Sequence, residues 1–569
     1  MTRACAIGLT LAPPVFYNAI VFRHNPEGLF VPVCLGKREK PLYIRNIMEI
    51  WSKRVVLLGL AGLLLASASD PPVVDLDLFH ELALIREALL EGSIPRADVF
   101  SYVPTVEPTV HHEWGTGALL YLITVRSGLG AAGLILTKLA LVAAIGVGCY
   151  LFAKRGGAGI AVIGPLAIIA TILASMAFTN VRAQLFTLLF LVALLLFLQE
   201  DQSGKRWWIG AWLPLYVVWI NLHGGATVGL FLVTLYGFER LVAEVMGGAS
   251  IWTAFRQVRH LAIVAGLMMA LTLVNPYGAG YLSYVWRAVS MDRAQWVPEW
   301  FPMWKLRDPG SLSMIPLFIL SLIIAAYSVN RSRQYRAPGV LFLLAAAWQA
   351  IVHFRHLSIY AVAWICITPA YLENTGLGRA MKATWENKRR VLTAIWAIIL
   401  IFTFGCAIWR KFWHLRIPAV QDPKWPVVYP VGAVDYFEQQ AFRGNVMVPF
   451  EVGAYVSWKL HPNIKVSVDS RFEAAYPVEW VVEVAMCYAG RNGWRETLTR
   501  YPTDAVLAPR GGPLENLLEQ SSDETTTADV VSWRKAYVDD GYSVFVRAEM
   551  ADRLPFVNRT GKQITGSFP

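Results

Sequence analysis

The chain has 569 residues, of which 56% are hydrophobic and only 16% are charged, and its mean hydropathy is +0.45. A soluble domain carries about a quarter charged residues, so the composition excludes an ordinary soluble protein and favours a membrane protein. The net charge of +11 lies mostly in short loops between apolar runs, as the positive-inside rule describes, and we therefore expect no nucleic acid as a partner.

Residues 1–47 precede the first long apolar run. They hold an apolar stretch broken by Pro13-Pro14 and then a basic cluster at residues 37–40, which is not the layout of a signal peptide with a cleavage site. Met48 opens an ordinary cytosolic lead-in to a membrane helix. We therefore predict that translation starts at Met48 and that residues 1–47 are upstream sequence; a cytosolic extension is the alternative.

Apolar runs long enough to cross a bilayer recur between Val55 and Ile408. Lys53 and Arg54 precede the first run, so it should lead from inside to outside and deliver Asp70 and the acids after it to the outer face. Following the basic turns along the chain gives eleven spans and leaves the C-terminal part outside. The predicted spans are residues 55–69, 131–153, 158–178, 185–199, 207–220, 226–245, 261–274, 311–329, 338–352, 357–373 and 391–408.

Two segments after the first span, residues 78–91 and 111–125, are amphipathic and should lie at the membrane interface. Residues 412–569 are less apolar, and short strands alternate with helices there, which predicts a small α/β domain. The expected strands are 445–449, 465–468, 504–508 and 542–546, and the expected helices are 431–440, 451–460 and 513–520. The predicted fold is an α-helical polytopic membrane domain, residues 48–411, followed by an outer α/β domain, residues 412–569.

Polar and ionisable residues between the spans gather on the predicted outer face, whereas the inner face has ordinary basic turns. Such groups are costly at a membrane and are usually functional, so the pattern predicts one polar site at the outer leaflet. A transporter more often has polar groups or helix breaks at mid-membrane, on both sides of a central site. The outer-face residues are Asp75, Asp77, Glu113, Arg182, His223, Asn275, Glu299, Arg355 and His356.

Asp75 and Asp77 are the first candidates for chemistry. A sugar transferase needs a carboxylate to take the proton of the acceptor hydroxyl or amine. Two acids two positions apart could share that task or bind a divalent cation, the only cofactor that the sequence suggests. The structural alternative is that they cap the helix that follows. We favour Asp77 as the base because it is nearer to His80 and to the start of the helix.

The run from His111 to Trp114 opens the second amphipathic segment, and His112 and Glu113 are assigned to the site, Glu113 as a third catalytic candidate. The alternative is a polar cap beside an interfacial Trp. His80, His112 and Glu113 could bind a metal, but their spacing matches no zinc signature. Asp98 either lines the same polar site or forms a turn.

Arg182, His223, Arg355 and His356 could hold a lipid-linked phosphate as it leaves, and contact with lipid headgroups is the alternative. Glu299, between Trp296 and Trp300, could bind a sugar beside a stacking ring or could belong to a membrane-surface loop. Asn275 completes the substrate-binding candidates. Asp469 and Arg471 in the C-terminal part are interpreted as an ion pair within that domain.

Five stretches carry a family resemblance: Asp75-x-Asp77-x-x-His80, residues 95–102 (Pro-Arg-Ala-Asp-Val-Phe-Ser-Tyr), His112-Glu113-Trp114, Asn221-Leu222-His223-Gly224 and Asn275-Pro276-Tyr277-Gly278. With the first acidic loop, the two amphipathic segments and the outer C-terminal domain, they resemble the GT-C superfamily of membrane glycosyltransferases. More closely, they resemble a bacterial group near the protein-mannosyltransferase and galacturonosyltransferase families. The resemblance covers most of the chain from Met48 onward.

The resemblance implies transfer of a sugar, with inversion, from a polyprenyl-phosphate carrier to an acceptor on the outer face of the bacterial cytoplasmic membrane. It also implies that Asp75 or Asp77 is the base, and that the partners are the lipid-linked donor, membrane lipid and a glycan, lipid or protein acceptor. Two features depart from the mannosyltransferase-like branch: Leu76 separates the two acids, and the second amphipathic segment begins His-His-Glu-Trp. A flippase of lipid-linked glycan and a non-catalytic envelope scaffold are the alternative functions.

Overall fold

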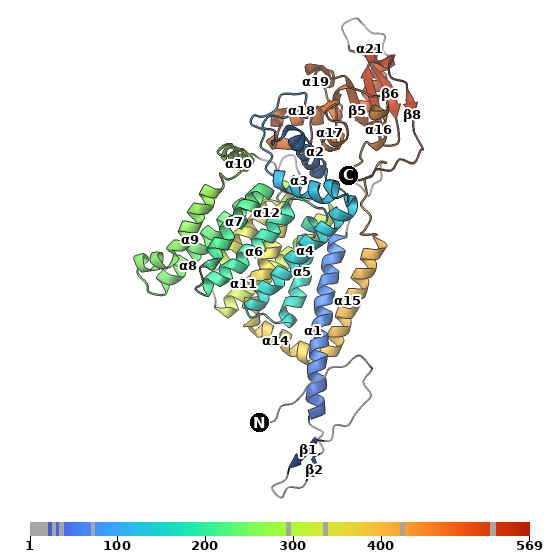
Figure 1. The fold of residues 1–569 in the computed structure, drawn as a ribbon. Coiled ribbons are helices and arrows are strands. Elements are labelled where there is room, and N and C mark those ends of the chain that lie inside the picture. The colour runs from blue at the N-terminus through green and yellow to red at the C-terminus, as the bar shows by residue number, and fades with distance from the viewer. Residues whose placement is uncertain are drawn as a thin grey trace.

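The chain is described here from a computed structural model, which places residues 21–24, 30–33, 39–69, 74–291, 298–333, 339–420, 427–523 and 531–569 (Figure 1). A body of long helices lies below a smaller domain that contains the sheet. Asp70, which the sequence placed at the outer end of the first span, lies outside the described residues.

Each of the eleven predicted spans corresponds to a helix, which confirms a helical polytopic membrane protein. Eight helices in the described residues are long and apolar enough to cross a membrane, and three of the eleven, α7, α12 and α13, are shorter, with 16, 13 and 17 residues. The helices are α1 Glu39–Ala68, α4 Gly130–Arg155, α5 Ile160–Phe178, α6 Gln184–Gln202, α7 Trp207–Leu222, α8 Thr227–Met246, α9 Ile251–Leu271, α11 Pro309–Ser332, α12 Val340–Val352, α13 Leu357–Glu373 and α15 Arg389–Trp409.

The centre of the helical body is α13, which is buried along almost its whole length, as expected for a helix that is apolar on every side. It packs against α5, α4, α11 and α12, while α1 pairs with α15 at one edge (Figure 1). Two short helices mark the two ends of the body. α10, Gly280–Ser290, lies on the side of the sheet domain, and α14, Gly376–Asn387, lies at the opposite end.

The C-terminal domain contains a six-stranded mixed sheet with the order β4-β3-β5-β7-β6-β8. All four predicted strands and all three predicted helices are present, while β6, β8, α18, α19 and α21 are additional. The strands are β3 Gly444–Met447, β4 Ile464–Val466, β5 Ala505–Pro509, β6 Trp533–Val538, β7 Tyr542–Arg547 and β8 Val557–Asn558. The helices are α16 Val431–Gln439, α17 Gly453–Leu460, α18 Val478–Tyr488, α19 Trp494–Arg500, α20 Pro513–Asp523 and α21 Ala548–Ala551.

The first amphipathic segment forms α2, Leu76–Glu91, which packs between α17 and α3, Trp114–Tyr121. Its position at the membrane interface stays a prediction. Nine of its residues are buried. Arg86 ties it to the sheet domain by donating to the backbone carbonyl of Trp458 at 2.6 Å.

The rest of the first loop also joins the C-terminal domain. The backbone N–H of Tyr102 donates to the carbonyl of Val466 on edge strand β4, and Val466 donates to the carbonyl of Phe100 at 2.9 Å. The second amphipathic segment is α3, which ends in one π turn, Leu122–Arg126. The first loop therefore fixes the sheet domain to the helical body.

The N-terminal residues include strands β1, Val21–His24, and β2, Phe30–Val33, which pair antiparallel. Helix α1 begins at Glu39 and passes through Met48 without a break. The start of translation at Met48 stays a prediction.

Candidate functional site

The predicted outer-face residues come from the starts of α2 and α3 and from segments that follow α5, α7, α9, α10 and α12. Helices α2, α3 and α10 lie where the helical body meets the C-terminal domain (Figure 1). Hydrogen bonds and ion pairs divide them into two groups, one around Arg182 and one around Glu113. The charges of Asp77 and Arg355 act on both groups.

The first group consists of three charged side chains, with Arg182 between Asp75 and Glu299. Arg182, in the loop after α5, donates through Nε to Asp75 and through Nη1 to Glu299 at 2.6 Å. Asn180 donates to the same Asp75 oxygen at 3.3 Å. Asp75 is also the N-cap of α2, since it accepts from the backbone N–H of Asp77 at 3.2 Å. Asp75 is thus both a helix cap and an ion-pair partner, and its carboxylate is already well satisfied.

Asp77 differs from Asp75 although it lies only two residues away. It is half-buried in the first turn of α2. Burial, followed by the negative charge of Asp75, raises the pKa of its carboxyl to about 7, with Arg182 opposing the shift and Glu113 adding to it. A group that exchanges its proton near neutral pH suits general acid–base chemistry.

The second group centres on Glu113, just before α3. His112 Nε2 lies 3.2 Å and His223 Nε2 lies 3.3 Å from the same carboxylate oxygen, Oε1. Burial opposes ionisation of Glu113, but His112, His223 and Arg355 outweigh it and lower its pKa to about 2. Glu113 is therefore ionised near neutral pH.

The tautomer of His223 follows from its other nitrogen. The backbone N–H of Gly225 points at His223 Nδ1 from 3.1 Å, so Nδ1 is an acceptor. Thr187 Oγ1 lies 2.6 Å from Nδ1 and accepts a hydrogen bond from the indole N–H of Trp219. The Thr187 hydroxyl can therefore donate its own hydrogen to His223 Nδ1. Burial lowers the pKa of His223 to about 4, and the neutral ring must then carry its proton on Nε2, directed at Glu113.

The charge of Arg355 influences a carboxylate in each of the two groups. Its charge lowers the pKa of both Glu113 and Glu299, and its guanidinium lies 5.4 Å from the ring centre of Trp300. His356 packs edge-on against the same ring. Within the described part of the chain, no carboxylate forms an ion pair with Arg355, unlike Arg182 with its two. Trp296, the other predicted stacking ring, lies outside the described residues.

Two predicted residues, His80 and Asp98, lie in a separate polar cluster against the C-terminal domain. His80 stacks on His111, with Nε2 and Nδ1 3.3 Å apart. Asp98 accepts from the backbone N–H of Ser101 at 2.7 Å and pairs with Arg471. Arg471 also binds Asp469 at 2.6 Å, so the expected ion pair of the C-terminal domain exists and extends into the first loop.

The polar groups of Asn275 are used within its own turn. Its Nδ2 donates to the carbonyl of Thr272 at 2.6 Å, and its Oδ1 accepts from the backbone N–H of Tyr277 at 2.8 Å. No group of three or more His, Cys, Asp or Glu side chains among the described residues is arranged to hold a metal ion. The geometry therefore gives no support to the divalent cation that Asp75 and Asp77 suggested.

Sequence reasoning missed two residues of the site. Glu81 lies one helical turn after Asp77, and burial together with the charges of Glu113 and Asp77 raises its pKa well above the usual range. The i, i+4 spacing of the two acids was a usable signal. Thr187 had no such signal, because a single hydroxyl inside an apolar span rarely indicates a role.

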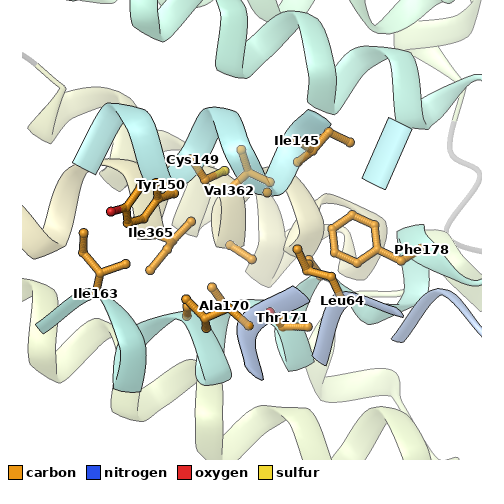
Figure 2. Close-up of a pocket in the computed structure, with 15 residues that line it drawn as sticks. Leu64, Ile145, Cys149, Tyr150, Ile163, Ala170, Thr171, Phe178, Val362 and Ile365 are labelled. Carbon is orange, nitrogen blue, oxygen red and sulfur yellow. The ribbon is translucent and has the colours of Figure 1, made fainter. Parts of the chain in front are cut away.

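An apolar pocket with a cavity volume of about 70 Å³ lies between α1, α4, α5 and α13. Figure 2 shows Leu64 and Phe178 at one end and Tyr150 and Ile163 at the other. Phe178 is the last residue of α5, and Asn180, which binds Asp75, follows two residues later. The pocket therefore ends next to the loop that holds Arg182.

No protein-family model matches the chain, and no curated protein matches it. Among solved structures, the chain is similar to the apo form of the oligosaccharyltransferase of Archaeoglobus fulgidus. The two align over 83% of this chain and 70% of that chain, with 12% sequence identity and a TM-score of 0.44.

Proposed function

We propose that this chain is a glycosyltransferase that moves a sugar from a polyprenyl-phosphate carrier to an acceptor at the junction between its helical body and its C-terminal domain. The observation that carries the proposal is Asp77. Burial and the charge of Asp75 raise the pKa of its carboxyl to about 7, with Arg182 opposing the shift. Arg355 acts on Glu113, whose charge in turn acts on Asp77.

Asp77 suits the role of base better than the other two acids. Asp75 is bound by Arg182, Asn180 and the backbone of α2. Glu113, with its pKa of about 2, is too weak a base for a hydroxyl. It would instead stabilise the positive charge that develops on the sugar as the bond to phosphate breaks.

Arg355 suits the leaving phosphate. A phosphate that departs with a growing negative charge needs a cation that is not already neutralised. Arg182 is held by Asp75 and Glu299, whereas Arg355 has a ring face beside it and no ion-paired carboxylate in the described chain. His356, which packs against the same Trp300 ring, supplies a second hydrogen-bonding group.

The apolar pocket suits the carrier's hydrocarbon chain. It runs along α5 and ends beside the Arg182 loop, so a prenyl chain lying in it would bring its phosphate to the polar junction (Figure 2).

The reaction balances with these residues alone. The acceptor oxygen or nitrogen attacks the anomeric carbon as Asp77 takes its proton, and the sugar–phosphate C–O bond breaks with both electrons leaving on the carrier phosphate. Attack from the face opposite the phosphate gives inversion. The distribution of basic turns supports an outer-face location for this site, and in our proposal this is the periplasmic side of a bacterial cytoplasmic membrane.

Single substitutions in purified protein test the proposal. Asp77→Asn should abolish transfer of labelled sugar from a polyprenyl-phosphate donor, whereas Glu496→Gln, at an exposed position of α19, should leave it unchanged. Full transfer by Asp77→Asn would rule out the proposed base, and full transfer by Asp75→Asn as well would exclude both acids. Movement of lipid-linked glycan across liposomes without transfer would make the chain a flippase.

A further inference from the structure

A second apolar groove lies at the ends of α7 and α9 beside α3, with a volume of about 680 Å³. It shares no lining residue with the pocket between α1, α4, α5 and α13. Its walls include Trp114, Ala118, Val218, Asn221, Val274 and Pro276.

The polar atoms in the groove's walls are already used. Trp114 donates its indole N–H to Asn221 Oδ1 at 3.0 Å, and Asn221 Nδ2 donates to the carbonyls of Val217 at 2.8 Å and Val274 at 2.9 Å. The amide of Asn275 closes its own turn. The side chains in the wall therefore offer a ligand only hydrocarbon surface, which excludes a sugar or a peptide as the main occupant.

The groove opens where the protein meets lipid. Val218 on α7 is 48% exposed and Val274 just after α9 is 49% exposed. Helix α9 is long and apolar enough to cross a membrane, and α7 is a shorter apolar helix beside it. In a membrane, exposed apolar side chains of this kind would contact lipid chains. The molecule that can enter is a membrane lipid.

Two residues that line the groove are close in sequence to residues of the Glu113 group. Trp114 directly follows Glu113, and Asn221 stands two residues before His223, the partner of Glu113 at 3.3 Å. A lipid whose chain lies in the groove would have its headgroup beside Glu113, whose charge acts on Asp77. The first pocket reaches the same polar junction from the Arg182 side.

We infer that the acceptor is itself a membrane lipid with a hydroxyl or amine in its headgroup, and that its hydrocarbon chain lies in the groove between α3, α7 and α9. This inference rests on the proposed function. Two apolar sites that reach one polar junction suit a reaction between two lipids. The headgroup O–H or N–H loses its proton to Asp77, its oxygen or nitrogen bonds to the anomeric carbon, and the carrier phosphate leaves.

Occupancy of the groove can be measured without any transfer. Purified protein is placed in vesicles that contain phosphatidylethanolamine with a diazirine-labelled acyl chain, and the cross-linked peptides are mapped by mass spectrometry. Label should appear on residues 217–222 and 274–276 and should fall severalfold in Val218→Trp, which fills the groove. Ile263→Trp is the matched control, because Ile263 is 58% exposed on α9 but does not line the groove.

Equal labelling of these peptides in both variants, or its displacement by added polyprenyl phosphate, would overturn the inference, since the groove would then bind no lipid specifically or would bind the carrier. Ala118→Phe, which fills the same groove from α3, provides a second variant if Val218→Trp does not fold.

Transfer assays separate this inference from the proposed function. With labelled donor and total bacterial lipid, product should be extracted with the lipids, and Val218→Trp should raise the KM for acceptor lipid about tenfold without changing the KM for donor. Product found only on water-soluble or protein acceptors would overturn the lipid acceptor and leave the transferase standing. Absence of transfer to every acceptor class, with label still in the groove, would instead overturn the proposed function and with it the acceptor role.

Discussion

Thr187 and His223 lie 2.6 Å apart, Oγ1 to Nδ1, and this contact sets the direction in which His223 donates its proton. Thr187 belongs to α6 and His223 to the turn after α7, so packing of two membrane helices determines the hydrogen bonding of Glu113, 3.3 Å beyond the other nitrogen. A buried helix contact thereby shapes the charge distribution at the polar junction.

The Thr187 contact predicts a clear difference between two substitutions. Thr187→Ser keeps the hydroxyl and should keep transfer activity, whereas Thr187→Val leaves Trp219 Nε1 and His223 Nδ1 with one partner fewer. An unmet buried hydrogen bond costs about 1–3 kcal/mol, so Thr187→Val should lower the free energy of unfolding by that amount and reduce kcat. Chemical denaturation in detergent, with kcat measured on the same samples, checks both; a Val variant equal to the Ser variant would contradict the assignment.

Arg471 predicts a large stability effect away from the reacting groups. It is buried and pairs with both Asp98 and Asp469, and removing one member of a buried ion network costs about 3–5 kcal/mol. Arg471→Met should therefore lower the unfolding temperature strongly and loosen the first loop from the sheet domain, seen as faster proteolysis near residues 95–110. Arg500→Met is the control, since Arg500 is 52% exposed in its pair with Glu483 and should cost at most about 1 kcal/mol.

The helical body and much of the C-terminal domain were predictable because their patterns are local. Long apolar runs and the spacing of Lys and Arg predicted the membrane helices, and short apolar runs predicted buried strands such as β5. Helix α2 shows the limit: its amphipathic pattern says that one side is buried but not against what, and the partner proved to be α17, more than 360 residues later.

The site was predictable in its residue types and its face, but not in its pairings. The ion pair between Asp75 and Arg182 joins residues 107 positions apart, and no spacing rule reaches that far. The same holds for Asp98 and Arg471. Of the two predicted roles of Asp98, a place in the site or a turn, the hydrogen bond from the backbone N–H of Ser101 matches the turn. The preference for Asp77 over Asp75 as the base stays a prediction. Its physical reason is that the Asp75 carboxylate is engaged as a helix cap and in an ion pair with Arg182.

Substitution of Asp77 is expected to affect stability and activity in opposite directions. Its pKa is raised from the usual value to about 7, so the folded protein binds this proton more tightly than the unfolded chain. Its contribution to stability is full at acidic pH and is lost as pH rises towards 7. Asp77→Asn should therefore be inactive yet more stable than the wild type above pH 7, with the gain shrinking towards pH 4. Unfolding measured across this pH range, with Glu496→Gln as control, tests it; equal pH dependence of Asp77→Asn and wild type would contradict the raised pKa.

The neighbours of Asp77 predict opposite shifts in the pH dependence of transfer. If Asp77 is the base, activity rises with pH through about 7, because only the ionised carboxylate accepts a proton. Arg182 lowers the pKa of Asp77 and Glu113 raises it, so Arg182→Met should move the acid limb of kcat/KM to higher pH and Glu113→Gln should move it to lower pH. Both variants will be slower, since each loses ion-pair or hydrogen-bond partners, but loss of rate alone cannot produce shifts of opposite sign. If the limb moves in the same direction in both, or stays in place, the titrating group is not Asp77.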